Sequence, residues 1–191
     1  DAGLNVGKGI RESNPLIATC KEQDSDKSLK IKIQNDYGRM PLSFVENDGQ
    51  LDEKVKFYEK GNGRVIFFTE RGVYLSLINS LNSQNPKSEL VKLIPLATSK
   101  TSKIIADGLL EGKVNYFTGN NSEKWKTNIA TYQSVVYKDI YKGIDMKFYG
   151  NNRQMEYDII VKPGANPSRV QLSYQGIKDL RVIGEGDLEV C

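Results

Sequence analysis

Apolar and polar residues alternate in short runs along most of the chain, and turn-forming residues separate one run from the next. In "KVKFYEK", residues 54–60, Val55 and Phe57 would lie on one side of an extended strand and the lysines on the other. Successive side chains of a β-strand point to opposite faces, so this period of two indicates strands that are buried on one side. Glycine-containing turns such as "GNG" at 61–63 and "ERG" at 70–72 then predict hairpins between neighbouring strands.

Strand-like runs recur at spacings of about 10 residues from Pro41 onward, and a sustained helical period is absent. This pattern predicts an all-β fold of β-sandwich-like antiparallel sheets, with a turn or short helical cap at 120–125. The stretch 98–113 fits no period clearly, and the prolines of "KPGANPS", 162–168, predict a crossover or turn. The alternation predicts a core that contains Phe44, Val55, Phe57, Phe67, Tyr74, Leu75, Tyr137, Phe148, Tyr157, Ile159 and Leu172.

The first part of the chain has a different character. Residues 1–28 are polar, rich in Gly, Ser, Asp and Lys, and show no period, which predicts a flexible or loosely docked N-terminal arm. "LKIKI" at 29–33 is the first clean alternation. We therefore expect the β-sandwich domain to span residues 29–191.

Composition restricts the chemistry that the chain could perform. Its 191 residues contain no histidine, which rules out a Ser-His-Asp or Cys-His nucleophile and an HExxH zinc site. The net charge of +3 comes from interspersed charges without a basic run, so we expect no nucleic-acid binding. No stretch approaches the roughly 18 apolar residues of a membrane-spanning helix. We predict a protein that is not an enzyme and has no cofactor, with Ca²⁺ as the one candidate ion.

The two cysteines, Cys20 and Cys191, are too far apart in the sequence for a CxxC zinc motif. In an oxidising compartment they could form one disulfide, and otherwise they would remain two thiols.

Acidic residues provide the candidates for calcium. Glu156 and Asp158 would project from the same face of one strand, and Asp145 could join them from the preceding strand. In the loop "ENDGQLDE", 46–53, Asp48 and Asp52 could also supply oxygens to Ca²⁺, although the loop does not match the EF-hand spacing. The alternative is structural: water-exposed strand faces carry charges, and Asn, Asp and Gly form turns. Two carboxylates across a deep cleft would instead indicate a glycoside-active enzyme.

Aromatic residues provide the candidates for a ligand. Trp125 is the only tryptophan, and Tyr116 and Tyr132 lie near it in the sequence. An exposed, coplanar platform of these rings would favour sugar stacking, whereas a half-buried ring that closes one end of the sandwich would be structural.

Three stretches resemble a known family: "PLSFVENDGQLDEKVKFYEKG", "VNYFTGNNSEKWKTNIATYQSVVYKDIYKGIDMKFYG" and "MEYDIIVKPGANPSRVQLSYQG". In this order they are similar to the N-terminal domain of bacterial secreted or cell-surface proteins that carry SBBP (β-propeller-type) repeats. The resemblance covers about residues 41–190 and implies an exported, β-rich, uncharacterised domain of large proteins. The repeats themselves are absent from this chain, and the family pattern continues past "GDLEV".

The residues and the resemblance together favour a non-catalytic, secreted or cell-surface β-rich module for adhesion, assembly or partner binding. A carbohydrate-binding module is the alternative, so the expected partner is a protein or a glycan. The resemblance also implies that strands of this sheet follow Cys191. We therefore expect the strand near 179–190 to be frayed or to pair with another chain, because an unpaired strand edge accepts another strand readily.

Overall fold

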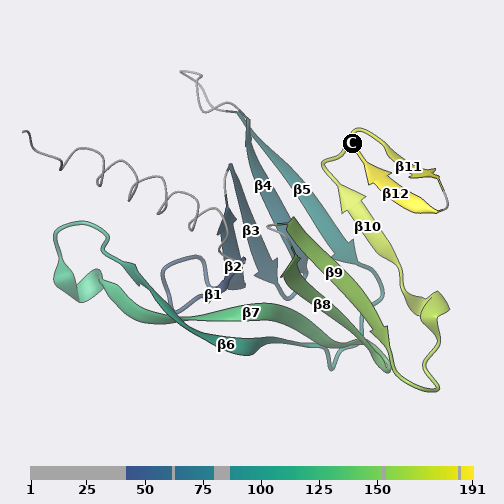
Figure 1. The fold of residues 1–191 in the computed structure, drawn as a ribbon, viewed down its shortest axis with the longest axis horizontal. Helices are drawn as coiled ribbons and strands as arrows, with labels where there is room; N and C mark the ends of the chain where they lie inside the picture. Colours follow the sequence, from purple (N-terminus) through teal and green to yellow (C-terminus); the bar gives the residue numbers. More distant parts are fainter. Residues whose placement is uncertain (1–41, 62, 80–86, 152–153, 185) are drawn as a thin grey trace, which may run out of the picture. The chain divides into compact units, whose positions relative to one another are not determined.

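The computed structural model describes residues 42–61, 63–79, 87–151, 154–184 and 186–191, and these residues form antiparallel β-sheets (Figure 1). The all-β prediction is confirmed, and the helices among these residues are two single 3₁₀ turns, η1 (Ser122–Lys124) and η2 (Pro167–Arg169). The predicted arm, residues 1–28, and the predicted strand at 29–33 lie outside the described residues. The strands are β1 (Phe44–Glu46), β2 (Val55–Gly61), β3 (Arg64–Thr69), β4 (Gly72–Asn79), β5 (Lys87–Pro95), β6 (Lys103–Tyr116), β7 (Lys126–Tyr141), β8 (Ile144–Asn151), β9 (Gln154–Val161), β10 (Leu172–Gln175), β11 (Leu180–Ile183) and β12 (Asp187–Val190).

Ten of these strands form one sheet. Its order is β10-β5-β4-β3-β2-β1-β7-β8-β9, with β6 as a further partner of β7, and all of its pairings are antiparallel. Consecutive strands from β2 to β5 form hairpins with each other, and so do consecutive strands from β6 to β9. The predicted hairpins between neighbouring strands continue as far as β9, and β10 then pairs with β5 at the other end of the sheet. The proline-containing segment 162–168 forms the predicted crossover.

Strand β7 joins the two parts of this sheet. Tyr132 pairs with Leu109 of β6 and with Phe44 of β1, whereas Ser134 pairs with Asp107 of β6 and with Tyr149 of β8. Strand β6 therefore occupies one edge of β7 from Lys126 to Lys138, and β1 and β8 follow each other along the opposite edge. The sheet consequently divides into a first part, β10-β5-β4-β3-β2-β1, and a second part, β6-β7-β8-β9.

A bend in β6 and β7 lies at the point where the two parts separate. Tyr132 and Val135 both contact the main core, although residues three apart in a regular strand point to opposite faces. Opposite this bend, Gly108 has a φ of 73°. A Cβ atom at Gly108 would lie 2.8 Å from Oε1 of Gln133, so a side chain here would collide with β7. Strands that pass from one sheet layer to another use such bends.

The main core lies between the two parts of the sheet. The Phe68 ring from the first part packs edge-on against the Phe148 ring from the second, with ring centroids 5.2 Å apart. Phe148 also contacts Tyr137, and the Tyr137 hydroxyl donates a hydrogen bond to the Thr69 carbonyl at 2.9 Å. The buried residues of this cluster are Phe44, Phe57, Ile66, Phe68, Val73, Leu93, Val135, Tyr137, Ile140, Tyr141, Ile144, Met146 and Phe148.

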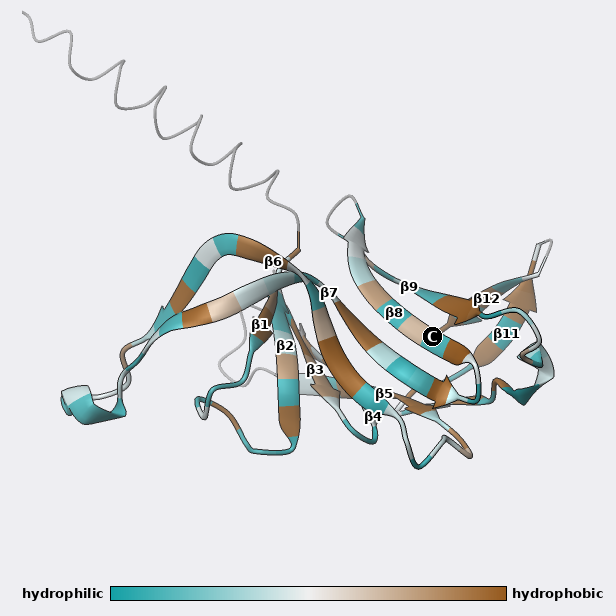
Figure 2. Cartoon of the chain, turned by 90° about the horizontal axis from the view of Figure 1, so that it is seen from below, coloured by the Kyte–Doolittle hydropathy of each residue, from teal (hydrophilic) through white to brown (hydrophobic). Residues whose placement is uncertain are grey.

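The predicted core agrees with the structure in part. Hydrophobic and hydrophilic residues alternate along strands such as β2 and β8 (Figure 2), and most of the predicted residues contact the main cluster. Val55 and Phe67 instead pack against a smaller cluster of Val45, Tyr58 and Ile129 on the opposite face of the first part. In β3 the completely buried ring is Phe68 rather than Phe67, because Ile66 and Phe68 share the inward face.

The last two strands form a separate hairpin. Leu180 pairs with Val190 and Val182 with Leu188, so these four apolar residues share one face, and each is more than one third exposed. Residues 180–183 and 187–190 pair with each other, so this part of the chain is neither frayed nor a single strand. Pairing of this hairpin with another chain stays a prediction.

The packing of Phe148 predicts that its removal would destabilise the fold severely. Phe148 has no exposed surface, whereas Phe117 is 62% exposed. We expect Phe148→Ala to lower the free energy of unfolding by about 3–5 kcal/mol, because it leaves a cavity between the two parts of the sheet. The matched variant Phe117→Ala should lower it by about 1 kcal/mol or less. Urea unfolding followed by fluorescence measures both, and equal effects would contradict this account of the core.

Candidate binding groove

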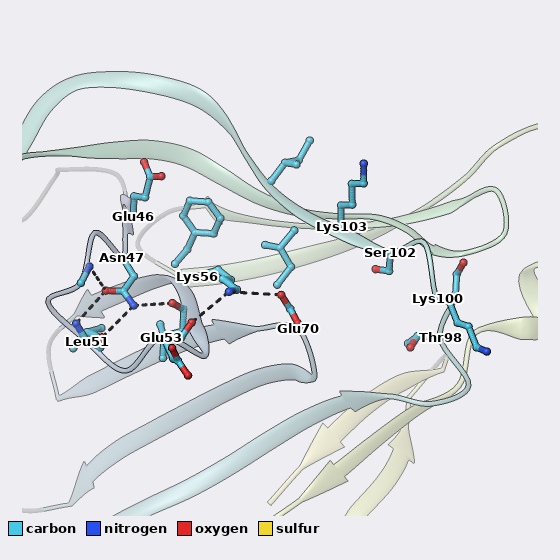
Figure 3. Close-up of a pocket in the computed structure, with 16 residues that line it drawn as sticks. Glu46, Asn47, Leu51, Glu53, Lys56, Glu70, Thr98, Lys100, Ser102 and Lys103 are labelled. Atoms are coloured by element: carbon cyan, nitrogen blue, oxygen red, sulfur yellow. Dashed lines mark hydrogen bonds and ion pairs between the residues drawn. The ribbon is translucent and has the colours of Figure 1, made fainter.

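A groove of about 800 Å³ lies between the β1–β2 loop, the β3–β4 turn and the β5–β6 loop (Figure 3). Val55, Phe57 and Ile104 provide apolar surface within it, and Phe57 is held by edge-on packing against the Tyr132 ring. Leu51 and Ile105 add further apolar surface, and Gly49 contributes backbone. The remaining lining is polar and charged: Glu46, Asn47, Glu53, Lys56, Glu70, Thr98, Ser99, Lys100, Ser102 and Lys103. The mixture of an apolar floor with polar groups is typical of ligand sites.

One wall of the groove is the β1–β2 loop, which Asn47 organises. The Asn47 amide donates to the carbonyls of Asp52 at 2.9 Å and Val55 at 2.7 Å. Its side-chain oxygen accepts from the backbone N–H groups of Leu51 at 3.0 Å and Gly49 at 3.2 Å. Asn and Gly favour turns because the Asn side chain bonds the nearby backbone and Gly adopts positive φ. The "ENDGQLDE" segment is therefore a hydrogen-bonded loop with a defined shape.

The opposite wall is the β5–β6 loop and the start of β6. The Ser99 backbone N–H donates to the Ile140 carbonyl at 2.8 Å, which fastens the loop to β7. Ser99 Oγ and Thr101 Oγ1 lie 2.8 Å apart. The loop thus presents hydroxyl groups beside Lys100 and Lys103, both of which are exposed.

The groove borders the backbone edge of β6. Lys103, Ile104 and Ile105 all line it, although consecutive side chains of a strand point to opposite faces. A cavity that meets three consecutive residues must therefore lie at the edge of the strand. The other edge of β6 pairs with β7, and no second strand pairs with β6 among the described residues. Alternate N–H and C=O groups of β6 consequently point toward the groove.

The acidic residues predicted as calcium ligands occupy three separate places. Asp48 Oδ2 lies 3.9 Å from Lys126 Nζ, and Asp52 Oδ1 accepts from the Lys54 backbone N–H at 2.9 Å. In the described part of the chain, no group of three acidic or cysteine side chains could hold a metal ion. The structure does not gather these residues into one site, and Ca²⁺ binding stays a prediction.

Glu156 and Asp158 both lie on the face of β9 away from the main core, whereas Met155, Tyr157 and Ile159 pack against the core. The Tyr149 hydroxyl lies 3.2 Å from Glu156 Oε2 and 3.2 Å from Asp158 Oδ1, so it connects the two carboxylates. They form part of a polar ladder across β8 and β9, which agrees with the structural interpretation of a charged strand face.

Asp145 has its own set of partners and is almost completely buried. It accepts hydrogen bonds from Lys138 Nζ at 2.9 Å, from the Asp139 backbone N–H at 2.8 Å and from Lys162 Nζ at 3.2 Å. Burial alone would raise the pKa of Asp145, but these hydrogen bonds outweigh it and hold the pKa below the ordinary value of 3.8. Asp145 belongs to β8, so these hydrogen bonds link β8 to β7 and to Lys162.

The three predicted aromatic residues do not form one platform. The Tyr116 hydroxyl is hydrogen-bonded to Tyr58 at 2.7 Å, and the Tyr132 hydroxyl donates to Glu46 Oε2 at 3.1 Å. Trp125 instead packs edge-on against Phe117 near η1, with ring centroids 5.2 Å apart. The Trp125 indole N–H donates to the Gly119 carbonyl at 3.1 Å, and Trp125 is 40% exposed. The aromatic partner of Trp125 is thus Phe117, which precedes it in the same part of the sequence, rather than Tyr116 or Tyr132.

Cys191 is exposed, and its proposed disulfide partner, Cys20, lies outside the described residues. None of the helices in the described part of the chain has the length and apolar character that a membrane crossing requires.

Comparison with known families assigns the chain to a family without assigning it an activity. The model of the family described as Domain of unknown function (DUF7948) matches residues 44–191, and the chain belongs to this family. The match begins at the first residue of β1 and includes all twelve strands of the described part. No curated protein and no solved structure matches the chain. The expectation of an uncharacterised domain is therefore confirmed.

The groove contains residues that the sequence analysis did not select. Lys100, Ser102 and Lys103 belong to "TSKTSK", a stretch with neither strand nor helix period. Its dense hydroxyl and lysine content was the only available signal. The edge of β6 that has no partner strand in the described part of the chain has no signal in the sequence, because a strand's sequence does not reveal how many of its edges are paired.

The buried carboxylates predict opposite responses to acid. The pKa of Asp145 is lowered in the fold, so its ionised form stabilises the protein above the unfolded pKa, and this stabilisation is lost as the pH falls through the lower folded pKa. Burial raises the pKa of Glu59, and Arg64 offsets this shift only in part. Glu59 therefore contributes stability below its unfolded pKa that is lost as the pH rises through its folded pKa.

We expect Asp145→Asn to be less stable than the wild type at neutral pH and to lose stability less steeply between about pH 4 and about pH 2. The matched variant Glu59→Gln should instead lose stability more steeply than the wild type at higher pH, as the pH falls from neutral to about the unfolded pKa of 4.5. Urea unfolding from about pH 7 to about pH 2 measures both slopes. An Asp145→Asn slope equal to that of the wild type would contradict the assigned role of Asp145.

Proposed function

We propose that this chain is a non-catalytic binding module that holds an extended segment of a partner polypeptide in the groove beside β6. The observation that carries the proposal is the edge of β6 at this groove, which pairs with no strand among the described residues. An extended peptide adds to such an edge as a further strand, and its backbone hydrogen bonds supply affinity for many sequences.

The surroundings of the edge support this mode of binding. Val55, Phe57 and Ile104 offer apolar contacts to alternate side chains of an added strand. Strand β6 is also long, at 14 residues, and Ile105 and Leu109 are exposed along it. Natural proteins commonly protect such edges with charges, proline or a covering segment. Covering this long edge and its exposed apolar residues with a partner strand would therefore be more favourable than leaving them in contact with water.

The sequence supports an exported, non-catalytic role. The absence of histidine removes the common nucleophile systems, and the resemblance to the N-terminal domain of SBBP repeat proteins favours a secreted or cell-surface protein that serves in adhesion or assembly. Labelling of intact cells with a membrane-impermeant reagent tests this location, and labelling only after lysis would contradict it.

Strand addition to β6 can be tested with peptides. We expect selection from a random peptide library on the whole chain to enrich sequences in which apolar and polar residues alternate. N-methylation of one alternate set of residues in a selected peptide should abolish binding, because that set faces β6. N-methylation of the other set should leave binding almost unchanged. Fluorescence anisotropy measures the affinities.

The protein provides a matched control for the same experiment. Ile105→Lys should weaken binding of the selected peptide at least tenfold, because a charged residue on the edge disfavours pairing. Ile183→Lys in β11 changes an equally exposed isoleucine outside the groove and should have no effect. Equal loss with both N-methylated peptides, or equal affinity of both variants, would contradict strand addition at β6.

Carbohydrate binding is the second candidate function, and the exposed Phe117–Trp125 pair favours it. The Trp125 indole N–H is already bonded to Gly119, so the ring offers its face rather than its polar group. Ring faces of this kind stack on apolar faces of sugars, and the edge-on contact with Phe117 holds the indole in place.

A glycan array tests the second candidate directly. If this function is correct, the chain binds a defined glycan, and Trp125→Ala reduces that binding at least tenfold, whereas Ile105→Lys leaves it unchanged. A glycan signal that Trp125→Ala does not alter would exclude the aromatic pair as the sugar site.

A further inference from the structure

The charged groups of the groove are distributed unequally between its two ends. Figure 3 shows Glu46 and Glu53 at the end formed by the β1–β2 loop, and Lys100 and Lys103 at the end formed by the β5–β6 loop. Between them, Lys56 Nζ lies 3.6 Å from Glu70 Oε1, so the central charges balance each other. The groove therefore has an acidic end, a neutral middle and a basic end.

The charges at the two ends of the groove have no ion-pair partner among the described residues. Lys103 pairs in register with Lys138, a like charge, and Lys138 is already bound to Asp145 at 2.9 Å. Lys100 and Lys103 form no ion pair with any described residue, and Glu46 and Glu53 form none either. The Tyr132 hydroxyl donates a hydrogen bond to one carboxylate oxygen of Glu46, Oε2. Both ends are thus available to charges of a ligand.

The direction in which β6 runs determines how a bound strand is oriented between the acidic end and the basic end of the groove. Strand β6 begins at Lys103, at the basic end of the groove, and runs toward Tyr116. All pairings in the main sheet are antiparallel, and an antiparallel pair is slightly more stable than a parallel one. A strand that adds antiparallel to β6 runs toward Lys103, so its C-terminal part reaches the lysines and hydroxyls.

We propose that the groove selects extended polypeptide segments that are basic at their N-terminal end, apolar in the middle and acidic at their C-terminal end. This inference rests on the proposed function, since it specifies the ligand of the same edge. The basic end of the segment meets Glu46 and Glu53, its alternate apolar side chains meet Phe57 and Ile104, and its acidic end meets Lys100 and Lys103. Complementary charges of this kind set orientation and specificity more than total affinity.

Two capped peptides of identical composition test the direction of binding. The forward peptide has lysines at its N-terminal end, alternating valine and threonine in the middle, and glutamates at its C-terminal end. The second peptide has the reversed sequence. We expect the forward peptide to bind the whole chain roughly tenfold more tightly at low salt, because reversal replaces several exposed attractions with repulsions. The difference should decrease as salt is added.

A charge-exchanged protein provides the decisive comparison. The double variant Glu53→Lys/Lys103→Glu keeps the net charge and should prefer the reversed peptide. A control variant, Lys60→Glu/Glu123→Lys, exchanges two charges that do not line the groove and should keep the forward preference.

The outcomes separate this inference from the proposed function. Equal binding of both peptides, with loss of binding in Ile105→Lys, would overturn the charge selection and leave strand addition in place. A preference of the wild type for the reversed peptide would overturn the antiparallel direction. If neither these peptides nor any library peptide binds in a manner sensitive to Ile105→Lys, the proposed function itself fails.

Discussion

The arrangement of the main sheet depends on the way in which β7 divides one of its edges between two partners. Strands β1 and β8 follow each other along this edge, while β6 occupies the other edge from Lys126 to Lys138. A flat sheet could not accommodate β1 and β8 together with all the strands that follow them. The two parts of the sheet therefore turn toward each other, and the rings of Phe68 and Phe148 meet between them. Burial of these rings then stabilises the bend that brought them together.

The same bend accounts for the position of the groove. Strand β6 follows β7 around the bend, so its first residues pass the β1–β2 loop while their outer edge has no partner in the described part of the chain. The two loops that close the groove are shaped by local hydrogen bonds, through Asn47 on one side and Ser99 on the other. The groove is thus a product of the sheet topology, whereas its charges come from loops that the topology leaves exposed.

Much of the fold was predictable because alternation is a local property. The runs around Phe57, Phe148 and Tyr157 identified strands and inward faces, and "NNSEKW" identified the turn that contains η1. Phe67 was chosen in place of Phe68 because two adjacent phenylalanines fit either face equally well. The pairing of β10 with β5 was not predictable, because the crossover after Pro163 determines no partner.

The candidate site was less predictable than the fold. Asp145, Glu156 and Asp158 have the spacing of a shared face, but the lysines that neutralise Asp145 come from β7 and from residue 162. Likewise, the ring that contacts Trp125 is Phe117, although Tyr116 and Tyr132 lie at similar separations from it in the sequence. Proximity at a surface depends on pairing register and strand bending, and neither is a property of a short segment.

The β6–β7 hairpin beyond the bend has a consequence for how such domains can diversify. Its far end carries η1 and the Phe117–Trp125 pair, and β6 and β7 are the strands that connect this end to the groove in the described part of the chain (Figure 1). Every second side chain of a strand points to the same face. Inserting two residues into each strand would therefore lengthen the hairpin by about 7 Å and leave each existing side chain on its present face. The reach of the aromatic tip can therefore evolve by small paired insertions, independently of the groove and of the core.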